Sequence, residues 1–201
     1  MKIGVIGAGY VGLVSGACFS EFGFDVVCID NDIKKIEMLE NNQIPIFEPG
    51  LSDLIKRNRN NGRLKFKNLF SEIKKCKVIF IAVGTPTTRR GEGKADLKYV
   101  YKVVEDLSEI LERKKETLVV TKSTVPIGTG ENIKKIILSK RSDLTYGEDF
   151  HIASNPEFLR EGSAIEDFMR PDRVVCGVDN EITKNILSEI YSPLNLREAP
   201  I

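Results

Sequence analysis

The chain has 201 residues, with 30 Lys and Arg against 29 Asp and Glu, one His, four Cys and no Trp. A hydrophobic fraction of 41% is typical of a globular protein, and this length suffices for one large domain. A formal net charge of +1 gives no broad positive field of the kind that captures nucleic acid or an anionic membrane. We therefore expect no nucleic-acid or membrane partner, and any anionic ligand must be held by a local site.

The four cysteines, Cys18, Cys28, Cys76 and Cys176, are widely spaced and form no C-x-x-C pair. This spacing argues against a metal site or a thioredoxin-like motif and favours a reduced, cytoplasmic protein. Residues 3–20 form an uncharged stretch about as long as a short membrane span. Five glycines interrupt it, as a tight strand-to-helix turn requires and a hydrophobic span does not, so neither a membrane segment nor a signal peptide is expected.

Short runs rich in Val and Ile alternate with helical patterns along the chain, which is typical of a parallel sheet covered by helices. The expected strands are residues 2–7, 25–30, 78–84, 117–123, 150–154 and 173–178. The expected helices are residues 10–21, 32–41, 50–60, 96–113, 129–140 and 181–191. Because strand–helix–strand crossovers are right-handed, the sequence predicts an α/β fold: a doubly wound, mostly parallel Rossmann-type sheet with helices on both faces.

The fourth expected helix has a clear amphipathic pattern. Apolar residues recur at helical spacing from Leu97 to Leu111, while Lys98 and Glu105 fall on the opposite face. The polar segment 87–95 (TTRRGEGKA) before it is expected to be an exposed loop. No internal repeat, low-complexity tract or linker divides the chain, so one domain is expected to fill almost all of it.

The segment GAGYVG (7–12) fits the pattern G-x-G-x-x-G, directly after the first expected strand. Gly7 allows a sharp turn, Gly9 lets the backbone approach a pyrophosphate, and Gly12 lets the helix pack closely on the strand. The helix N-terminus then offers free N–H groups and a partial positive charge to the pyrophosphate. Asp30 ends the next strand, where it would accept from both ribose hydroxyls and repel a 2′-phosphate, which favours NAD over NADP. The alternative is a glycine-rich turn without a ligand.

Several further segments lie where expected strands end, namely IPIFEPGL (44–51), VGTP (83–86), KSTVPIGT (122–129) and SNPEFLREGSA (154–164). Ligands of open α/β sheets bind beyond the carboxyl ends of the strands, so these segments indicate a site. The alternative is that Thr85, Thr124 and Asn155 only cap the helices that follow.

Three charged residues also have two interpretations. Lys35 could touch the ribose region or be a solvated lysine on a helix face. Glu157 and Glu161 would share a face if EFLRE is helical, and an acid pair on a helix is more often a surface feature than a functional one.

Together, these segments and their order resemble the N-terminal part of the UDP-glucose/GDP-mannose dehydrogenase family. The resemblance runs from Lys2 to about Leu194 and is carried by IGAGYVGL, IPIFEPGL, FIAVGTP, ADLKYV, KSTVPIGT and SNPEFLREGSAIEDFMRPDRVVCGV. Gly162 and the segment PDR (171–173), which follow NPEFLRE, favour the UDP-glucose members over those acting on GDP-mannose or UDP-N-acetylmannosamine.

The resemblance implies oxidation of UDP-glucose to UDP-glucuronate in two successive hydride transfers to NAD. It implies that the cofactor is bound by Gly7, Gly9, Tyr10, Val11, Gly12, Asp30, Lys35, Thr85, Thr124 and Glu161. It implies that the sugar nucleotide is lined by Glu157, Phe158, Leu159, Arg160 and Glu161. Thr124 and Glu161 resemble the family's water-positioning and acid/base residues, and Glu157 a supporting acid. A carboxylate in a closed site can be tuned toward a neutral pKa, which suits proton transfer.

The chain also departs from the family pattern. Family members are much longer, and their nucleophilic Cys lies in a later Gly-Cys-Phe-Pro-Lys-Asp-like motif that none of the four cysteines matches. The long central helix, which carries a catalytic Lys and Asn and the homodimer contact, has no counterpart here. We expect residues 1–194 to be the NAD-binding domain and 195–201 to begin the connection to that helix and a C-terminal domain.

Two expectations follow from this departure. The chain alone should bind NAD without making UDP-glucuronate, because the covalent step and half of the cleft are missing. The cysteines should be small buried hydrophobes, with Cys28 and Cys176 in strands. The alternatives are a non-catalytic NAD-binding module and the same half of a GDP-mannose or UDP-N-acetylmannosamine dehydrogenase.

Overall fold

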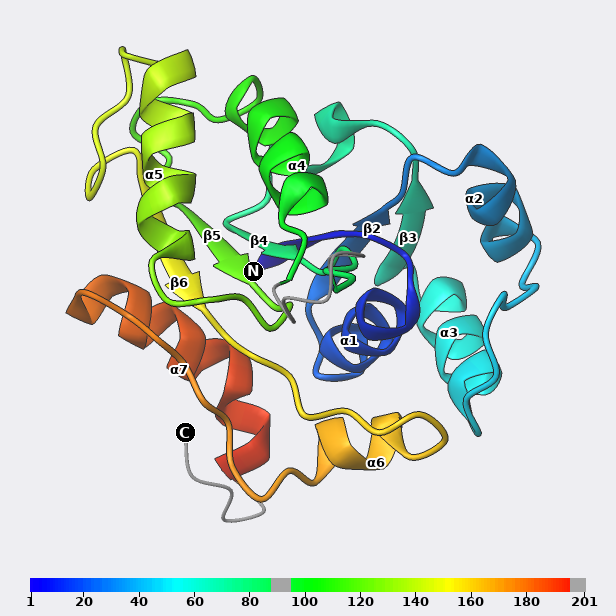
Figure 1. Cartoon of the computed structure of the whole chain (residues 1–201). Coiled ribbons are helices and arrows are strands. Elements are labelled where there is room, and N and C mark those ends of the chain that lie inside the picture. Colours follow the sequence, from blue (N-terminus) through cyan, green and yellow to red (C-terminus); the bar gives the residue numbers. More distant parts are fainter. Residues whose placement is uncertain (88–94, 196–201) are drawn as a thin grey trace.

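Six parallel strands form one sheet in the order β3-β2-β1-β4-β5-β6 in the computed structural model, which describes residues 1–87 and 95–195 (Figure 1). The strands are β1 (Lys2–Ile6), β2 (Asp25–Ile29), β3 (Leu64–Lys67), β4 (Val78–Ile81), β5 (Thr117–Thr121) and β6 (Phe150–Ser154). The helices are α1 (Tyr10–Glu21), α2 (Ile33–Glu40), α3 (Leu51–Asn60), the 3-10 turn η1 (Phe70–Ile73), α4 (Lys98–Ser108), α5 (Thr129–Lys140), α6 (Ala164–Met169) and α7 (Glu181–Asn195).

The order of the strands reverses between β1 and β4. On one side of β1 lie β2 and then β3, and on its other side lie β4, β5 and β6 in that order. Every neighbouring pair is parallel, so the carboxyl ends of all six strands lie at the same edge of the sheet. This arrangement confirms the predicted doubly wound Rossmann-type fold, whose ligands bind at the reversal.

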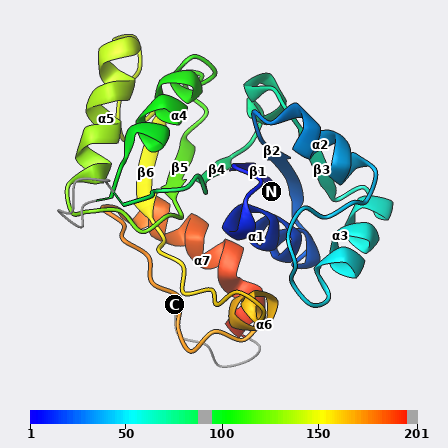
Figure 2. The same ribbon diagram turned by 45° about the vertical axis from the view of Figure 1, so that its right-hand side comes forward.

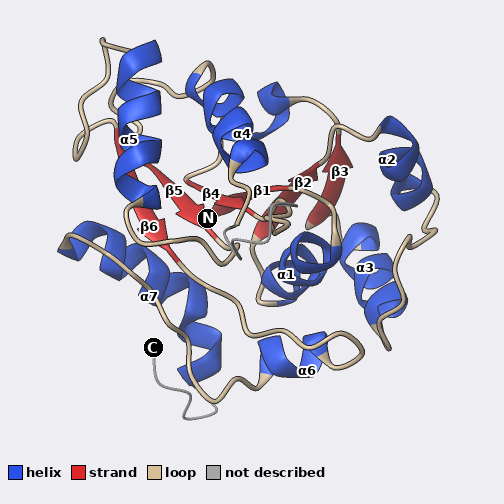
Figure 3. Cartoon of the chain, viewed as in Figure 1, coloured by secondary structure: helices blue, strands red, loops and turns tan. Residues whose placement is uncertain are grey.

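Helices cover both faces of the sheet (Figure 3). Helices α4 and α5 lie on one face, whereas α1, α3, α6 and α7 lie on the other (Figure 2). The alternation of side chains along each strand supplies both cores. In β1, Ile3 and Val5 belong to the α1 core, and Ile6 belongs to the α4 core. Because both faces of the sheet are buried, the central strands are almost entirely apolar, and these apolar runs are why they were predicted as strands.

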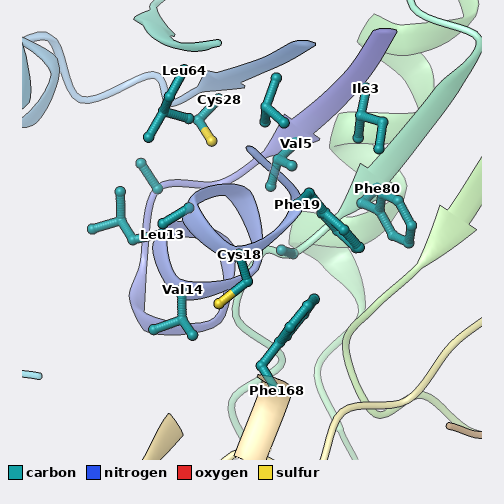
Figure 4. Close-up of a cluster of buried hydrophobic side chains, with 14 of the residues drawn as sticks. Ile3, Val5, Leu13, Val14, Cys18, Phe19, Cys28, Leu64, Phe80 and Phe168 are labelled. Atoms are coloured by element: carbon teal, nitrogen blue, oxygen red, sulfur yellow. The ribbon is translucent and has the colours of Figure 1, made fainter. Parts of the chain in front are cut away.

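Helix α1 is enclosed on all sides. Its residues from Gly12 to Ser20 are all buried, so the uncharged stretch near the N-terminus is a central strand followed by a buried helix. Phe19 stacks on Phe80 of β4 with ring centroids 4.7 Å apart and meets the edge of Phe168 of α6 at 5.2 Å (Figure 4). The helix is thus fixed between the sheet and α6.

Two sequence-based predictions about strands are wrong. The run 173–178 is not a strand, since only Gly177 pairs with Ser154, in a single antiparallel bridge. The missed strand is β3, whose residues alternate between buried and exposed because it lies at the edge of the sheet. Lys65 and Lys67 interrupt its apolar pattern, as is usual at an edge exposed to solvent.

The remaining differences concern helices and loops. Helix α4 ends at Ser108, before the predicted end at 113, although Leu111 is still buried. Helix α6 and the turn η1 were not predicted, because each is too short to show helical periodicity. The predicted loop 87–95 begins and ends with a bridge between Thr87 and Ala95, and the part between them lies outside the described residues, as do residues 196–201. Within 1–87 and 95–195, none of the helices combines the length and apolar character needed to cross a membrane.

Candidate functional site

The glycine turn between β1 and α1 packs closely on neighbouring backbone at two of its three glycines. Gly7 has a φ of 102°, and a Cβ there would lie 2.7 Å from the carbonyl oxygen of Ala82. A Cβ on Gly12 would lie only 1.8 Å from the carbonyl oxygen of Gly7. By contrast, no heavy atom of residues 1–87 and 95–195, apart from Gly9 and its two chain neighbours, lies within 4 Å of the Cβ position at Gly9. The turn is therefore packed where Gly7 and Gly12 stand and open at Gly9, where a ligand would approach the backbone.

The N-terminus of α1 has the charge and the donors to bind an anion. Gly9 is the N-cap residue and supplies no side-chain hydrogen bond, and the first turn contains no acidic residue. The first N–H groups of a helix have no partner within it and carry the positive end of the helix dipole. Since α1 starts at the carboxyl edge of the sheet, these groups offer a site that fits a pyrophosphate.

Asp30 lies directly beside this turn. Its Oδ2 accepts hydrogen bonds from the N–H of Ala8 at 2.8 Å and from the Lys35 ammonium at 2.9 Å, and its Oδ1 accepts from the N–H of Asp32 at 3.0 Å. Partial burial raises the pKa of Asp30, but the N–H of Asp32, the ammonium of Lys35 and the N–H of Ala8 outweigh it and hold the pKa below its ordinary value. The carboxylate is thus ionised at neutral pH and fixed to the glycine turn, and Lys35 is its ion-pair partner rather than a solvated surface lysine.

The loops after β4 and β5 meet beside the glycine turn. Ser123 donates its hydroxyl to the carbonyl oxygen of Val83 at 2.7 Å, which joins the two loops. Thr85 is half-buried in the first loop, and Thr124 is exposed in the second. The alternative interpretation, in which Thr85, Thr124 and Asn155 only cap the following helices, is wrong, because other residues stand at the N-caps of α4, α5 and α6. Those residues are Leu97, Gly128 and Ser163.

The segment 157–161 (EFLRE) is a loop between β6 and α6, not a helix. The i, i+4 argument for a shared face of Glu157 and Glu161 therefore does not apply. Glu157 is half-buried and accepts from the N–H of Leu159 at 2.6 Å, whereas Glu161 is exposed. Phe158 is 65% exposed, and the Arg160 guanidinium pairs with Asp167 of α6 at 2.6 Å.

Residues 1–195 match the sequence profile of the NAD-binding domain of the UDP-glucose/GDP-mannose dehydrogenase family. This chain belongs to that family. The match confirms the resemblance found in the sequence.

Curated relatives agree with this assignment. A UDP-glucose 6-dehydrogenase from Rhizobium meliloti is 52% identical over 204 aligned residues, which cover 100% of this chain and 45% of the relative. A UDP-glucose 6-dehydrogenase from Bacillus subtilis is 48% identical over 195 residues, covering 96% of this chain and 41% of the relative. The chain thus spans less than half the length of these relatives.

Solved structures of the family have the same fold. A ternary complex of GDP-mannose dehydrogenase from Pseudomonas aeruginosa superposes with a TM-score of 0.92 at 37% identity, covering 100% of this chain and 45% of that one. A UDP-glucose dehydrogenase from Pyrobaculum islandicum gives a TM-score of 0.88 at 38% identity, covering 99% and 45%.

Sequence reasoning missed a buried polar cluster below the 157–161 loop. The ammonium of Lys122, directly after β5, donates to Asn155 Oδ1 at 2.9 Å and to Tyr191 Oη of α7 at 3.3 Å. The Tyr191 hydroxyl also hydrogen-bonds Asn155 Oδ1, and the ammonium lies 5.4 Å from the ring centroid of Phe168. These residues line a cavity of about 800 Å³, which Glu157 lines as well.

Lys122 is only 4% exposed, and burial lowers its pKa to about 8, although the nearby Glu157 carboxylate acts in the opposite direction. The signal that could have found it is a lysine inside the apolar run TLVVTKS (117–123), where a buried strand does not tolerate a charge without a partner. Its partners are Asn155, directly after β6, and Tyr191 in α7, and both lie so far away in the sequence that the sequence alone could not identify them.

Three of the four cysteines are buried as predicted, and Cys176 differs both in its burial and in its local structure. Cys18, Cys28 and Cys76 are buried and Cys176 is partly buried, and all four are free thiols. Burial raises the pKa of Cys28 to about 12 and that of Cys76 to about 11, so neither thiol is an activated nucleophile. Cys28 lies in β2 as predicted, but Cys176 lies outside any strand because 173–178 is a loop.

Proposed function

We propose that this chain binds NAD at the glycine turn and supplies the NAD-binding half of an enzyme that oxidises UDP-glucose to UDP-glucuronate. The observation that carries the proposal is the ionised Asp30 carboxylate, hydrogen-bonded to Ala8 of a turn that is open at Gly9. The pyrophosphate would lie against Gly7, Gly9 and Gly12 and the N–H groups of Tyr10 and Val11, at the positive end of α1. Bound NAD would accept a hydride from the sugar.

The hydrogen bonds already made by Asp30 limit how it can bind a ribose. An ionised carboxylate has about four lone-pair positions. Oδ2 uses two for Ala8 and Lys35, and Oδ1 uses one for Asp32. A first hydroxyl can donate to Oδ1 directly, whereas a second requires the ammonium of Lys35 to leave Oδ2. We therefore expect Lys35 to move toward the ribose on binding, and the negative carboxylate to disfavour a 2′-phosphate.

We further propose that Thr85, Thr124 and Glu161 complete the cofactor site and that residues 157–161 bind the sugar nucleotide. Exposure of Thr124 and Glu161 at the carboxyl edge of the sheet supports this proposal. The Thr124 hydroxyl would hold a water and the Glu161 carboxylate would take or give a proton. Glu157, which is half-buried and lines the same cavity as Lys122, would act as a supporting acid.

In the loop 157–161, two side chains are already oriented by protein contacts. The Glu157 carboxylate is tied to the N–H of Leu159, and Arg160 is held by Asp167. Phe158 is exposed and free of the core, so its ring is available to a ligand. A loop with such internal contacts would require little reordering to bind the sugar nucleotide.

Titration calorimetry of the chain with NAD tests the cofactor site. Asp30→Ala should weaken NAD binding about tenfold or more, because hydrogen bonds to a charged group contribute about 1.5–3 kcal/mol. Asp25→Ala is the matched control, since Asp25 is exposed at the opposite end of the same strand, and it should leave the affinity unchanged. Equal NAD affinities of the Asp30 variant and the unmodified chain would refute the assignment, as would tighter binding of NADP than of NAD.

A second arm of this experiment follows NADH formation with UDP-glucose. The chain alone should bind NAD without sustained turnover, because its described thiols are free but unactivated and the family's covalent step needs a thiolate. Sustained NADH formation by the isolated chain would show that one of its own residues replaces that nucleophile.

The similarity to a GDP-mannose dehydrogenase at a TM-score of 0.92 favours one specific alternative, the same half of an enzyme for another sugar nucleotide. Thermal unfolding with UDP-glucose, GDP-mannose and UDP-N-acetylmannosamine would rank the three, since a ligand that binds only the folded chain raises its Tm. The largest shift should come from UDP-glucose. A shift with NAD and with none of the sugar nucleotides would favour a non-catalytic NAD-binding module.

We also propose that residues 1–194 form the NAD-binding domain of a longer dehydrogenase that acts as a homodimer in the cytoplasm. Four free thiols support a reducing setting. That residues 195–201 begin the connection to a further domain stays a prediction.

A further inference from the structure

Glu48 is a buried carboxylate in the loop between α2 and α3, and it has no part in the site described so far. The residue is only 7% exposed. Oε2 accepts from the N–H of Gly162 at 2.9 Å, and Oε1 accepts from the N–H of Ile165 at 3.2 Å. The hydroxyl of Tyr10 donates to the same Oε2. A buried carboxylate is costly unless it is hydrogen-bonded, and here three donors from two other segments bind it.

The three segments that meet at Glu48 are far apart in the sequence. Tyr10 is the first residue of α1, where the pyrophosphate is proposed to bind, and Gly162 directly follows the proposed substrate loop 157–161. Figures 1 and 2 show α1 lying between α3, which follows the Glu48 loop, and α6, which follows the substrate loop. Glu48 thus stands where the cofactor segment and the substrate segment touch.

Tyr10 completes the junction. The N–H of Gly162 donates to the Tyr10 hydroxyl at 2.8 Å as well as to Glu48. Burial and the hydrogen bond to Glu48 raise the pKa of Tyr10, the Glu161 carboxylate adds a smaller effect in the same direction, and the N–H of Gly162 opposes them. The phenol therefore stays protonated and donates to Glu48. Ser163, the N-cap residue of α6, makes no side-chain cap, so Glu48 supplies an acceptor that α6 lacks locally.

We propose that Glu48 is a positioning residue that, together with Tyr10, holds the 157–162 segment against the start of α1 and thereby couples cofactor binding to the order of the substrate loop. The coupling rests on the proposed function, because it requires NAD to bind at α1. The positioning of the 157–162 segment by Glu48 requires no ligand. When NAD restrains the first turn of α1, Tyr10 is restrained with it, and the Glu48 bridge passes this restraint to Gly162. By linkage, a sugar nucleotide that orders the loop would tighten NAD binding by the same factor.

Amide hydrogen exchange of the whole chain, with and without NAD, tests this inference. The variant Glu48→Gln has one amide oxygen in place of two carboxylate oxygens, so it can accept from Gly162 or from Ile165 but not from both with equal strength. Without ligand, exchange in peptides covering 157–165 should become about tenfold faster in the variant, as expected for loss of a charged hydrogen bond. Glu40→Gln is the matched control, because Glu40 is exposed and pairs only with Lys67 among the ion pairs described, and it should leave these peptides unchanged.

The NAD arm separates positioning from general stability. In the unmodified chain, NAD should slow exchange both at 7–12 and at 157–165, whereas in Glu48→Gln it should slow exchange at 7–12 alone. Tyr10→Phe keeps the ring and removes the hydroxyl. In this variant too, NAD should slow exchange at 7–12 but not at 157–165, so it replaces Glu48→Gln if that variant does not fold. Unchanged exchange at 157–165 in the ligand-free variant would overturn the positioning role, and equal NAD-dependent protection there in both chains would overturn the coupling. If NAD protects no segment of the unmodified chain, the proposed function fails, while the ligand-free comparison still decides the positioning role.

Discussion

Replacing the buried Lys122 by methionine should change how the stability of the protein depends on pH. Methionine has nearly the length of the lysine stem and carries no charge. In the native chain Lys122 has a pKa lowered by burial to about 8, against 10.5 for an ordinary lysine. At a pH between these two values, Lys122 is protonated in the unfolded chain but has lost its proton in the native chain. The native chain with Lys122 therefore becomes more stable as the pH rises through this window.

The structure allows the size of this effect to be worked out. Each pH unit between 8 and 10.5 corresponds to about 1.4 kcal/mol, so the full window is worth about 3 kcal/mol. From pH 7 to pH 9, which covers the lower part of the window, the contribution of Lys122 rises by about 1 kcal/mol. The buried thiols act in the opposite direction above pH 9, because their raised pKa values keep them protonated only in the native state. They are present in both proteins and cancel in the difference.

The assay is urea unfolding of the unmodified chain and Lys122→Met at pH 7, 8 and 9, followed by circular dichroism. The quantity of interest is the difference in the free energy of unfolding between the two proteins at each pH. The variant also leaves Asn155 and Tyr191 without the ammonium, which costs about 1–3 kcal/mol. That cost is independent of pH, so only the change of this free-energy difference with pH reports on the lowered pKa of Lys122.

The unmodified chain should gain about 1 kcal/mol relative to Lys122→Met between pH 7 and pH 9. Lys56→Met is the control, because Lys56 is exposed on α3, and its difference from the unmodified chain should stay constant. Parallel stability curves for the unmodified chain and Lys122→Met would mean that Lys122 keeps its ordinary pKa in the native protein, which would refute the proposed effect of burial.

Two further predictions concern the packing of α1. Gly12→Ala places a Cβ 1.8 Å from the carbonyl oxygen of Gly7 and should destabilise the chain by at least about 2 kcal/mol. Gly130→Ala should be neutral or stabilising, because among the described residues its Cβ would meet only Ile152, at an ordinary contact distance of 3.7 Å. Comparable Tm values for the two variants would contradict the close contact. Phe19→Ala removes a ring stacked in the core and should cost about 3–5 kcal/mol in urea unfolding; a loss below about 1 kcal/mol would mean that the core collapses around the gap.

The sequence by itself determined the features that depend on neighbours along the chain. The glycine turn, the strand before it and the acid that ends the next strand lie within Lys2–Asp30, and their physical requirements are local. The central strands β1, β2, β4 and β5 are buried on both faces and are continuous apolar runs, so all four were predicted. Strand β6 lies at an edge of the sheet but is also mostly buried, and it was predicted as well. The family was also predicted, because whole motifs in a fixed order carried the resemblance.

Only the tertiary structure decided which distant residues meet at the carboxyl edge of the sheet. Strand β3 has two lysines among its four residues and no continuous apolar run, so only its pairing with β2 shows that it is a strand. The run 173–178 is apolar, but within the described residues it forms a single bridge and no ladder. Neither the partners of Lys122 nor the junction at Glu48 follows local periodicity, since each joins segments tens of residues apart. A buried charge is tolerated only where such distant donors and acceptors converge, and that convergence is a property of the fold rather than of any local stretch of sequence.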